Sequence, residues 1–194
     1  LYFKLNNPYD SKGNYVGYFG CTGRNSKISN VGIVDSYFCG LNYVGGVCGH
    51  HSYGEISNCY SAGAVSATSN FVGGVCGTNS SGSTISNCYF DSEKCDKNAI
   101  GLNYGTATNT KGKTTAQFAS GEVCYLLNGS KSDGTQAWYQ DLTPETGDKH
   151  PVLTNSGNNT VYYARLLCGG IKNVGNTYAN TKTVSIEHIL IGEP

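Results

Sequence analysis

One phrase of seven residues occurs twice in this chain. Tyr-Val-Gly-Gly-Val-Cys-Gly at residues 43–49 returns as Phe-Val-Gly-Gly-Val-Cys-Gly at residues 71–77, a spacing of 28 residues. A second phrase, Ile-Ser-Asn-Cys-Tyr, occurs at residues 56–60 and again at residues 85–89. A fainter copy begins at Tyr15. Self-similarity at a period of about 20 to 50 residues is typical of solenoids and arrays, so we expect one structural unit repeated along an axis.

The local pattern within each repeat indicates β-structure. Apolar clusters of three to five residues alternate with Gly, Ser and Asn, and apolar residues do not recur at helical spacing. We therefore expect a mainly β fold, a short right-handed parallel β-helix. Each repeat should contribute three short strands, which stack on those of the next coil about 4.8 Å away.

The repeated residue types fit such a stack. Valines should point inward and lie on their copies: Val44, Val47, Val72 and Val75. Isoleucines should form a second column: Ile28, Ile56 and Ile85. The paired glycines would allow tight corners or a positive φ. Asn58 and Asn87 should stack and bond through their amides along the axis, which is a structural role rather than a binding role.

The two phrases together resemble the GLUG-motif repeat of large bacterial surface proteins, which include some IgA-cleaving peptidases and adhesin-like proteins of gut bacteria. The clear copies cover residues 43–91, and Phe19 and the Val-Gly-Ile sequence at 31–33 extend a degenerate copy towards Tyr15. Cys48 and Cys76 depart from the motif, where an aliphatic residue is usual. The resemblance implies an extracellular, repetitive and non-catalytic segment, and it names no ligand.

We expect three regions. Residues 1–112 should form the β-helix, and residues 113–160 a capping region with a helix at Thr114–Asn128 that closes the open end of the solenoid. Thr114 and Gln117 have the spacing of a capping box. Short strands should follow at residues 138–139 and 151–153. Residues 161–194 should form a small antiparallel β appendage from strands at 161–168 and 183–191.

Charge argues against two classes of partner. The 194 residues carry 13 Lys and Arg against 13 Asp and Glu, a formal net charge of zero, and no basic tract is present. Nucleic acids and anionic membranes both need a basic surface, so we expect neither as a partner. No apolar run approaches the roughly 18 residues of a membrane helix. The start at Leu1 and the absence of Met favour a piece of a longer protein.

Nine cysteines are present without any Cys-x-x-Cys pair. Cys48 and Cys76 are one repeat apart, as are Cys59 and Cys88. Stacked Cα atoms lie within disulfide range, but parallel in-register side chains point the same way. Buried free thiols are therefore favoured, and disulfides remain the alternative.

Catalytic, cofactor and metal sites are not expected. A metal site from His50, His51 and Glu55 has little support, because the next repeat has Thr-Asn in place of the histidines. Polysaccharide cleavage would need grouped carboxylates. Asp35 is expected at the stacked asparagine corner, and Asp91 in a charged loop, apart from Glu55.

Aromatic side chains are the remaining signal for binding. Four tyrosines could form a stacking platform for a sugar or a protein: Tyr53, Tyr60, Tyr89 and Tyr104. Because Tyr60 and Tyr89 are one repeat apart, a purely structural external ladder is favoured for that pair.

The sequence therefore predicts a non-catalytic extracellular module of a bacterial cell-surface protein, acting in adhesion or as a stalk. Its partner would be a host or microbial surface glycan or protein, without insertion into a membrane. Two alternatives are a carbohydrate-active β-helix fragment and an accessory domain that presents substrate to a surface peptidase.

Overall fold

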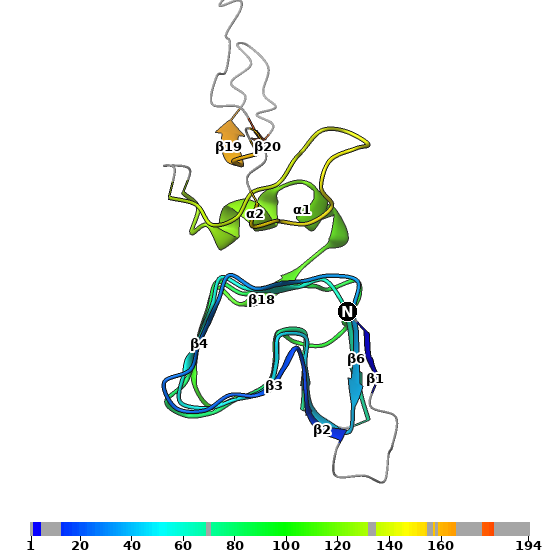
Figure 1. Cartoon of the computed structure of the whole chain (residues 1–194), viewed down its shortest axis with the longest axis vertical. Coiled ribbons are helices and arrows are strands. Elements are labelled where there is room, and N and C mark those ends of the chain that lie inside the picture. The colour runs from blue at the N-terminus through cyan, green and yellow to red at the C-terminus, as the bar shows by residue number, and fades with distance from the viewer. Residues whose placement is uncertain are drawn as a thin grey trace, which may run out of the picture.

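The computed structural model describes residues 2–4, 13–68, 71–131, 135–154, 157, 159–165 and 176–180. Strands between Tyr2 and Lys113 wind into a parallel β-solenoid of about three turns (Figure 1). The mainly β, parallel solenoid predicted from the repeats is confirmed.

The first two coils contain five short strands each, and the third contains four. The first coil comprises β2 (Asn14–Val16), β3 (Phe19–Cys21), β4 (Lys27–Ser29), β5 (Gly32–Ile33) and β6 (Tyr37–Gly40). The second comprises β7 (Asn42–Gly45), β8 (Cys48–His51), β9 (Glu55–Ser57), β10 (Tyr60–Ser61) and β11 (Ala64–Ala67). The third comprises β12 (Val72–Gly73), β13 (Cys76–Asn79), β14 (Thr84–Ser86) and β15 (Tyr89–Asp91). A last partial coil adds β16 (Ile100–Asn103), β17 (Thr106–Thr108) and β18 (Lys111–Lys113), and β1 (Tyr2–Lys4) precedes the first coil.

Equivalent strands of successive coils pair in parallel and build five sheets. Their orders are β1-β6-β11, β12-β7-β2, β16-β13-β8-β3, β17-β14-β9-β4 and β18-β15-β10-β5. Because each strand bonds to its copy in the next coil, the backbone groups of the inner coils are satisfied along the axis.

The predicted columns of apolar residues are confirmed. Ile28 pairs with Ile56, and Ile56 with Ile85, in consecutive coils. Val44 pairs with Val72, and the backbone N–H of Val47 donates to the carbonyl oxygen of Val75 at 2.9 Å. These side chains are buried in one continuous core. Each fully buried side chain of this size contributes roughly 1.5–3 kcal/mol to the free energy of folding.

The prediction of three strands per repeat is wrong, since two of the three predicted clusters are each divided in two and the third remains the single strand β11. The Val-Gly-Gly-Val-Cys cluster becomes β7 and β8, separated by a turn at residues 46–47. The Ile-Ser-Asn-Cys-Tyr cluster becomes β9 and β10, because Asn58 between them has φ of 53°. Asparagine tolerates this left-handed conformation better than other non-glycine residues, so it forms the corner.

The paired glycines of the repeat allow close packing of the backbone and do not adopt a positive φ. Between β2 and β3 the chain folds back into the coil (Figure 1), and β7 and β8 line this re-entrant fold in the next coil. A Cβ atom on Gly45 would lie 2.2 Å from the carbonyl oxygen of Cys48 and 2.7 Å from Cα of Cys76. The positive φ falls on Tyr43, at 56°, and not on Gly45.

The predicted helix is present as two short ones. α1 (Thr115–Ala119) begins with the predicted capping box between Thr114 and Gln117. It is separated from α2 (Glu122–Leu127) by Gly121, which has φ of 87°. Within the described part of the chain, no helix has both the length and the apolar character needed to cross a bilayer.

The helices cover the side of the solenoid and not its end, as Figure 1 shows. They pack on the sheet β18-β15-β10-β5, whose outward residues Tyr60 and Tyr89 share a second core with Phe118 and Trp138. The expected closure of the open end by this helix is therefore wrong. The helical region instead packs its apolar residues, Phe118 and Trp138 among them, on Tyr60 and Tyr89 at the side of the solenoid.

The last described strands form a separate hairpin. β19 (Tyr162–Arg165) pairs in antiparallel register with β20 (Asn176–Ala179). β20 lies in the stretch that was expected to be a link, and the predicted strand at 183–191 lies outside the described residues. The short strands predicted at 138–139 and 151–153 meet as one antiparallel bridge between Tyr139 and Val152.

Candidate functional site: a groove beside the asparagine column

Two of the four tyrosines predicted for ligand contact are not on the surface. Tyr60 and Tyr89 are 3% and 2% exposed. The hydroxyl group of Tyr60 donates to the carbonyl oxygen of Pro151 at 2.7 Å, and its ring centroid lies 5.3 Å from that of Trp138. Burial raises the pKa of Tyr89 to about 12. The expectation of an external Tyr60–Tyr89 ladder is corrected, because the helical region covers both rings.

The other two tyrosines are exposed, Tyr53 by 50% and Tyr104 by 68%. The guanidinium carbon of Arg24 lies 4.7 Å from the ring centroid of Tyr53. Gly82 of the next coil packs so closely that an added Cβ would lie 3.1 Å from the Tyr53 ring. Gly82 belongs to the coil between those of Tyr53 and Tyr104, and contact of these two exposed tyrosines with a ligand stays a prediction.

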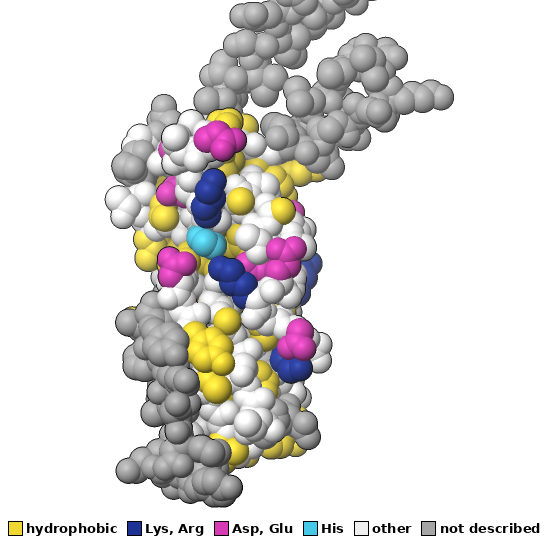
Figure 2. Space-filling model, turned by 90° about the vertical axis from the view of Figure 1, so that its right-hand side faces the viewer, with side chains coloured by type: hydrophobic (Ala, Val, Ile, Leu, Met, Phe, Trp, Pro, Cys, Tyr) yellow, Lys and Arg dark blue, Asp and Glu magenta, His cyan; other side chains and the backbone are white. Residues whose placement is uncertain are grey.

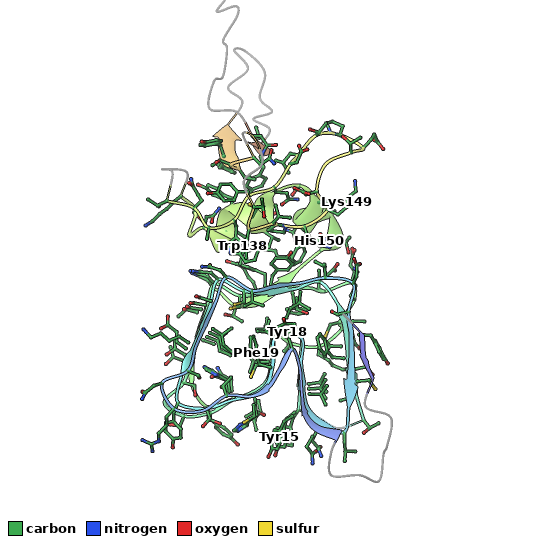
Figure 3. All side chains as sticks on the ribbon, viewed as in Figure 1. Tyr15, Tyr18, Phe19, Trp138, Lys149 and His150 are labelled. Carbon is green, nitrogen blue, oxygen red and sulfur yellow. The ribbon has the colours of Figure 1, made fainter. Side chains whose placement is uncertain are left out.

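A different aromatic column was missed. Tyr15, Tyr43 and Phe71 stack at ring-centroid distances of 5.0 Å, with interplanar angles of 13° and 5°. They lie at the mouth of the re-entrant fold, where Figure 3 shows Tyr15. The signal was available, since each ring opens one copy of the repeated phrase. Stacked rings hide their faces from solvent, so this column stabilises the coils and leaves little surface for a sugar.

The carboxylates do not gather in one groove. Glu55 lies on β9, opposite Lys27 of β4, whereas Asp91 lies on the sheet under the helices. Asp91 is fully buried, and its carboxylate accepts hydrogen bonds from the backbone of Glu93 and from the hydroxyl of Thr115 at 2.6 Å. These bonds give Asp91 a structural role at the start of α1.

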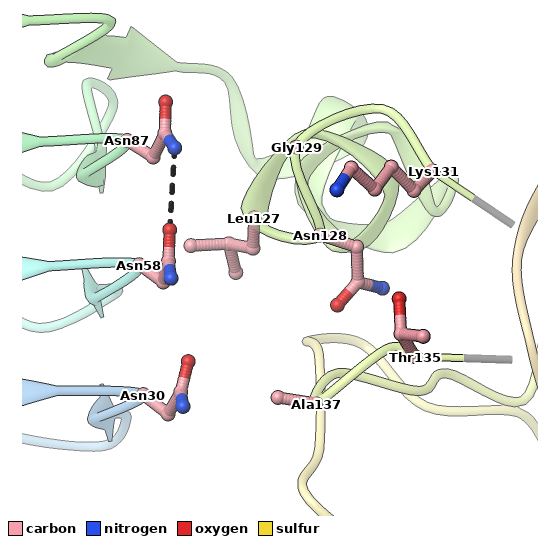
Figure 4. Close-up of a pocket in the computed structure, with 9 residues that line it drawn as sticks. All are labelled: Asn30, Asn58, Asn87, Leu127, Asn128, Gly129, Lys131, Thr135 and Ala137. Carbon is pink, nitrogen blue, oxygen red and sulfur yellow. Dashed lines mark hydrogen bonds between the residues drawn. The ribbon is translucent and has the colours of Figure 1, made fainter. Parts of the chain in front are cut away.

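Asp35 does not occupy the asparagine corner, where Asn30 stands instead, as Figure 4 shows. Asp35 and Asp91 act electrostatically on His150, together with Lys94. Burial is the largest cause that lowers the pKa of His150. Figure 2 shows charged side chains gathered on this side of the molecule, where the helical region meets the solenoid. Both signs are present there, so no strongly basic or acidic surface results.

The stacked cysteines are free thiols, as are all eight cysteines in the part of the chain that the structure describes. Cys48 pairs in register with Cys76. The thiol of Cys76 donates to the carbonyl oxygen of Thr78 at 3.2 Å, and that of Cys88 to Ser86 at 3.2 Å. Burial raises the pKa of Cys76 and of Cys88, so both remain protonated.

The two neighbouring histidines have separate environments. His50 lies within 3.5 Å of the Cys21 sulfur and 3.1 Å of the Ser80 hydroxyl. His51 is fully buried, and its Nδ1 lies 2.7 Å from the hydroxyl of Thr22. Among the described residues, no group of three or more His, Cys, Asp and Glu side chains could hold a metal ion.

A polar groove of about 450 Å³ lies beside the asparagine column. Figure 4 shows its two walls, the column on one side and the end of α2 with the segment after it on the other. The lining residues are Asn30, Asn58, Asn87, Leu127, Asn128, Gly129, Lys131, Thr135 and Ala137. Sequence reasoning found the column but not the groove, since the second wall comes from a distant part of the chain.

The amides of the column bond along the axis, as predicted. Asn109 donates through Nδ2 to Oδ1 of Asn87 at 3.1 Å, and Asn87 donates to Oδ1 of Asn58 at 3.3 Å. The chain of hydrogen bonds between the side-chain amides ends there. Nδ2 of Asn58 and the amide of Asn30 have no hydrogen-bond partner within the described ranges, and both are half-buried beside the groove.

The second wall is fixed to the column by hydrogen bonds. The indole Nε1 of Trp138 donates to the carbonyl oxygen of Asn58 at 3.1 Å. Asn128 in turn holds Trp138, with its amide bonded to both the N–H and the C=O of that residue, at 3.0 and 2.8 Å. The groove is thus formed by packed and bonded elements.

Comparison with known families identifies the repeat. The GLUG motif matches residues 40–66, the second coil of the solenoid, from the end of β6 to within β11. No curated protein and no solved structure matches the chain. The motif is found in bacterial surface proteins and is typical of extracellular ones. The second coil of the solenoid therefore carries a GLUG motif.

Proposed function

We propose that the chain is a non-catalytic module of a bacterial cell-surface protein, and that it serves as a rigid adhesive stalk. The observation that carries the proposal is the in-register stacking of like residues in successive coils. A structure of this kind extends by adding coils, and each added coil continues the same five sheets. It holds its surface features in fixed positions along an axis, as a stalk or an adhesin requires.

The placement of the carboxylates supports a non-catalytic role over glycosidic cleavage. Hydrolysis of a glycosidic bond needs two carboxyl groups across one groove. Glu55 and Asp91 lie on different sheets, and Asp91 is fully buried and bonded to Thr115. The described residues that line the groove beside the asparagine column include no Asp or Glu.

A glycan array and a host-protein array with the purified chain test the proposal. The expected result is binding to a surface glycan or protein, with the bound glycan recovered uncleaved by mass spectrometry. Release of shortened glycan would contradict the non-catalytic role and favour the carbohydrate-active alternative. If neither array gives binding, adhesion is excluded and the module is a spacer only.

The accessory-domain alternative makes a different prediction. A module that presents substrate to a peptidase should bind the substrate protein of that peptidase and none of the glycans. Binding confined to one protein on the host-protein array would favour this alternative.

A further inference from the structure

We propose that the groove beside the asparagine column binds a short oligosaccharide that includes a sugar with a carboxylate group. The inference deepens the proposed adhesive role and rests on it for the source of the ligand. The binding chemistry itself comes from the groove.

The size and lining of the groove suit a few sugar rings. A volume of about 450 Å³ lies within the range of about 300–1,000 Å³ that is usual for small-molecule sites. Ala137 supplies apolar contact for the C–H face of a ring, and the asparagines supply polar contact for its hydroxyl groups. A sugar ring presents both kinds of surface.

The free amide atoms provide the hydrogen bonds. A primary amide has two N–H donors and one acceptor oxygen, so it can bond two neighbouring hydroxyl groups of one sugar. Nδ2 of Asn58 and the whole amide of Asn30 are available for this, because the amide chain from Asn109 ends at Oδ1 of Asn58. Ligand hydroxyls would therefore continue a hydrogen-bond chain that already runs along the axis.

The charge of the groove favours an acidic ligand. Among the described residues that line the groove, Lys131 is the one with an ionisable side chain. Figure 4 shows that it extends from the second wall towards the asparagine column. The described residues form no ion pair with Lys131, and its ammonium group would bind the carboxylate of the ligand.

An extended peptide fits the groove less well. Groups on one face of an extended peptide repeat every two residues, about 6.6 Å, whereas the amides repeat at the coil spacing of about 4.8 Å. A peptide would then lose register with the column after one step. Strand addition is also disfavoured, because the backbone N–H groups of Asn30, Asn58 and Asn87 already bond to neighbouring coils.

The test is calorimetric titration of the whole chain with 3′-sialyllactose and with lactose. The two sugars differ by one carboxylate-bearing ring. We expect sialyllactose to bind more tightly than lactose, and its affinity to fall as salt is added, because the Lys131 contact is screened. Equal binding of the two sugars, or binding of neither at millimolar concentration, would overturn the proposal.

Two pairs of variants locate the site. Asn58→Asp keeps the acceptor for Asn87 but removes the free donor and adds a negative charge, and it should weaken sialyllactose binding at least ~tenfold. Asn14→Asp is the matched control, since Asn14 likewise accepts a bond from the asparagine of the next coil, Asn42, at 2.9 Å. Lys131→Ala should reduce the affinity for sialyllactose to that for lactose, whereas Lys27→Ala, at a lysine that does not line the groove, should not. If a variant and its control lose the same affinity for sialyllactose, the sugar binds at another site.

Competition separates the remaining outcomes. A glutamate tripeptide that displaces sialyllactose with equal potency would show a general anion site and overturn the sugar assignment. If the arrays show adhesion that Asn58→Asp leaves intact, the groove inference fails and the proposed function stands. If the groove binds sialyllactose but the arrays show cleavage of glycans, the proposed function fails and the groove inference stands.

Discussion

Val47 donates its backbone N–H to the carbonyl oxygen of Val75, which is the same residue of the next repeat. The two side chains are fully buried in one column of the core. Because each residue stacks on its counterpart in the next coil, few other side chains can be accommodated at positions within the stack. Substitutions there should cost far more than substitutions at the turns.

Gly45 is the position where this constraint is sharpest. We expect Gly45→Ala to lower the free energy of unfolding by about 3 kcal/mol or more, since the new methyl group would lie 2.2 Å from the carbonyl oxygen of Cys48. Gly23→Ala is the control, because a Cβ there meets nothing within 4 Å. Urea unfolding followed by circular dichroism measures both. Equal midpoints for the two variants would contradict the close packing of β7 against β8.

His51 should make stability depend on pH. Burial lowers its pKa below the ordinary 6.5 in the folded state. Below about pH 6.5 the unfolded chain binds a proton that the folded chain refuses, so the free energy of unfolding should fall as the pH falls. Above that pH the ring is neutral in both states and contributes no pH dependence.

The variant His51→Asn isolates this effect, because Asn79 occupies the paired position of the next coil. The variant should be folded at pH 7.5 and should lose part of the decline between pH 6.5 and 5. His50→Asn, at the neighbouring position, is the matched control. An unchanged pH profile in His51→Asn would mean that the buried ring is not the source. His150, whose pKa is also lowered, should account for part of the decline that remains.

The sequence was sufficient to predict which residues recur in successive coils. Identity between phrases 28 or 29 residues apart predicts which residues stack, and the isoleucine and asparagine columns follow from it. The number of strands could not be read in the same way, since it depends on left-handed backbone at Asn58 and Tyr43. Tyrosine in that conformation is uncommon, so composition gave no reason to place a corner there.

The contacts between the repeats and the helical region could not be predicted from the sequence for a related reason. The bond from Trp138 to Asn58 joins residues 80 positions apart, and Trp138 lies outside the repeats. Tyr60 and Tyr89 recur as expected, but recurrence does not say which side of a sheet another element will cover. The groove was missed for this reason, while its asparagine wall was found.

The thiols offer a test of burial. Iodoacetamide at pH 8 should label Cys21 first, because it is exposed, and Cys39 more slowly. Cys48, Cys59, Cys76 and Cys88 should react only after denaturation, since they are buried. Peptide mass spectrometry after timed quenching gives the order. Absence of labelling at these four positions even in denaturant without reductant would show disulfides in place of free thiols.

Trp138 reports whether the helical region and the solenoid unfold together. It is the single tryptophan of the chain and is 1% exposed, next to Tyr60. Phe118, fully buried against the same tyrosine, joins the two parts.

Phe118→Ala should lower the free energy of unfolding by about 3–5 kcal/mol through the cavity it leaves. Because the second core contains residues of both parts, tryptophan fluorescence and the β-sheet signal in circular dichroism should shift to lower urea together. Tyr104→Ala, at a ring that is 68% exposed, should change either midpoint little. A fluorescence transition that moves while the circular dichroism transition stays in place would show that the helical region unfolds independently of the solenoid.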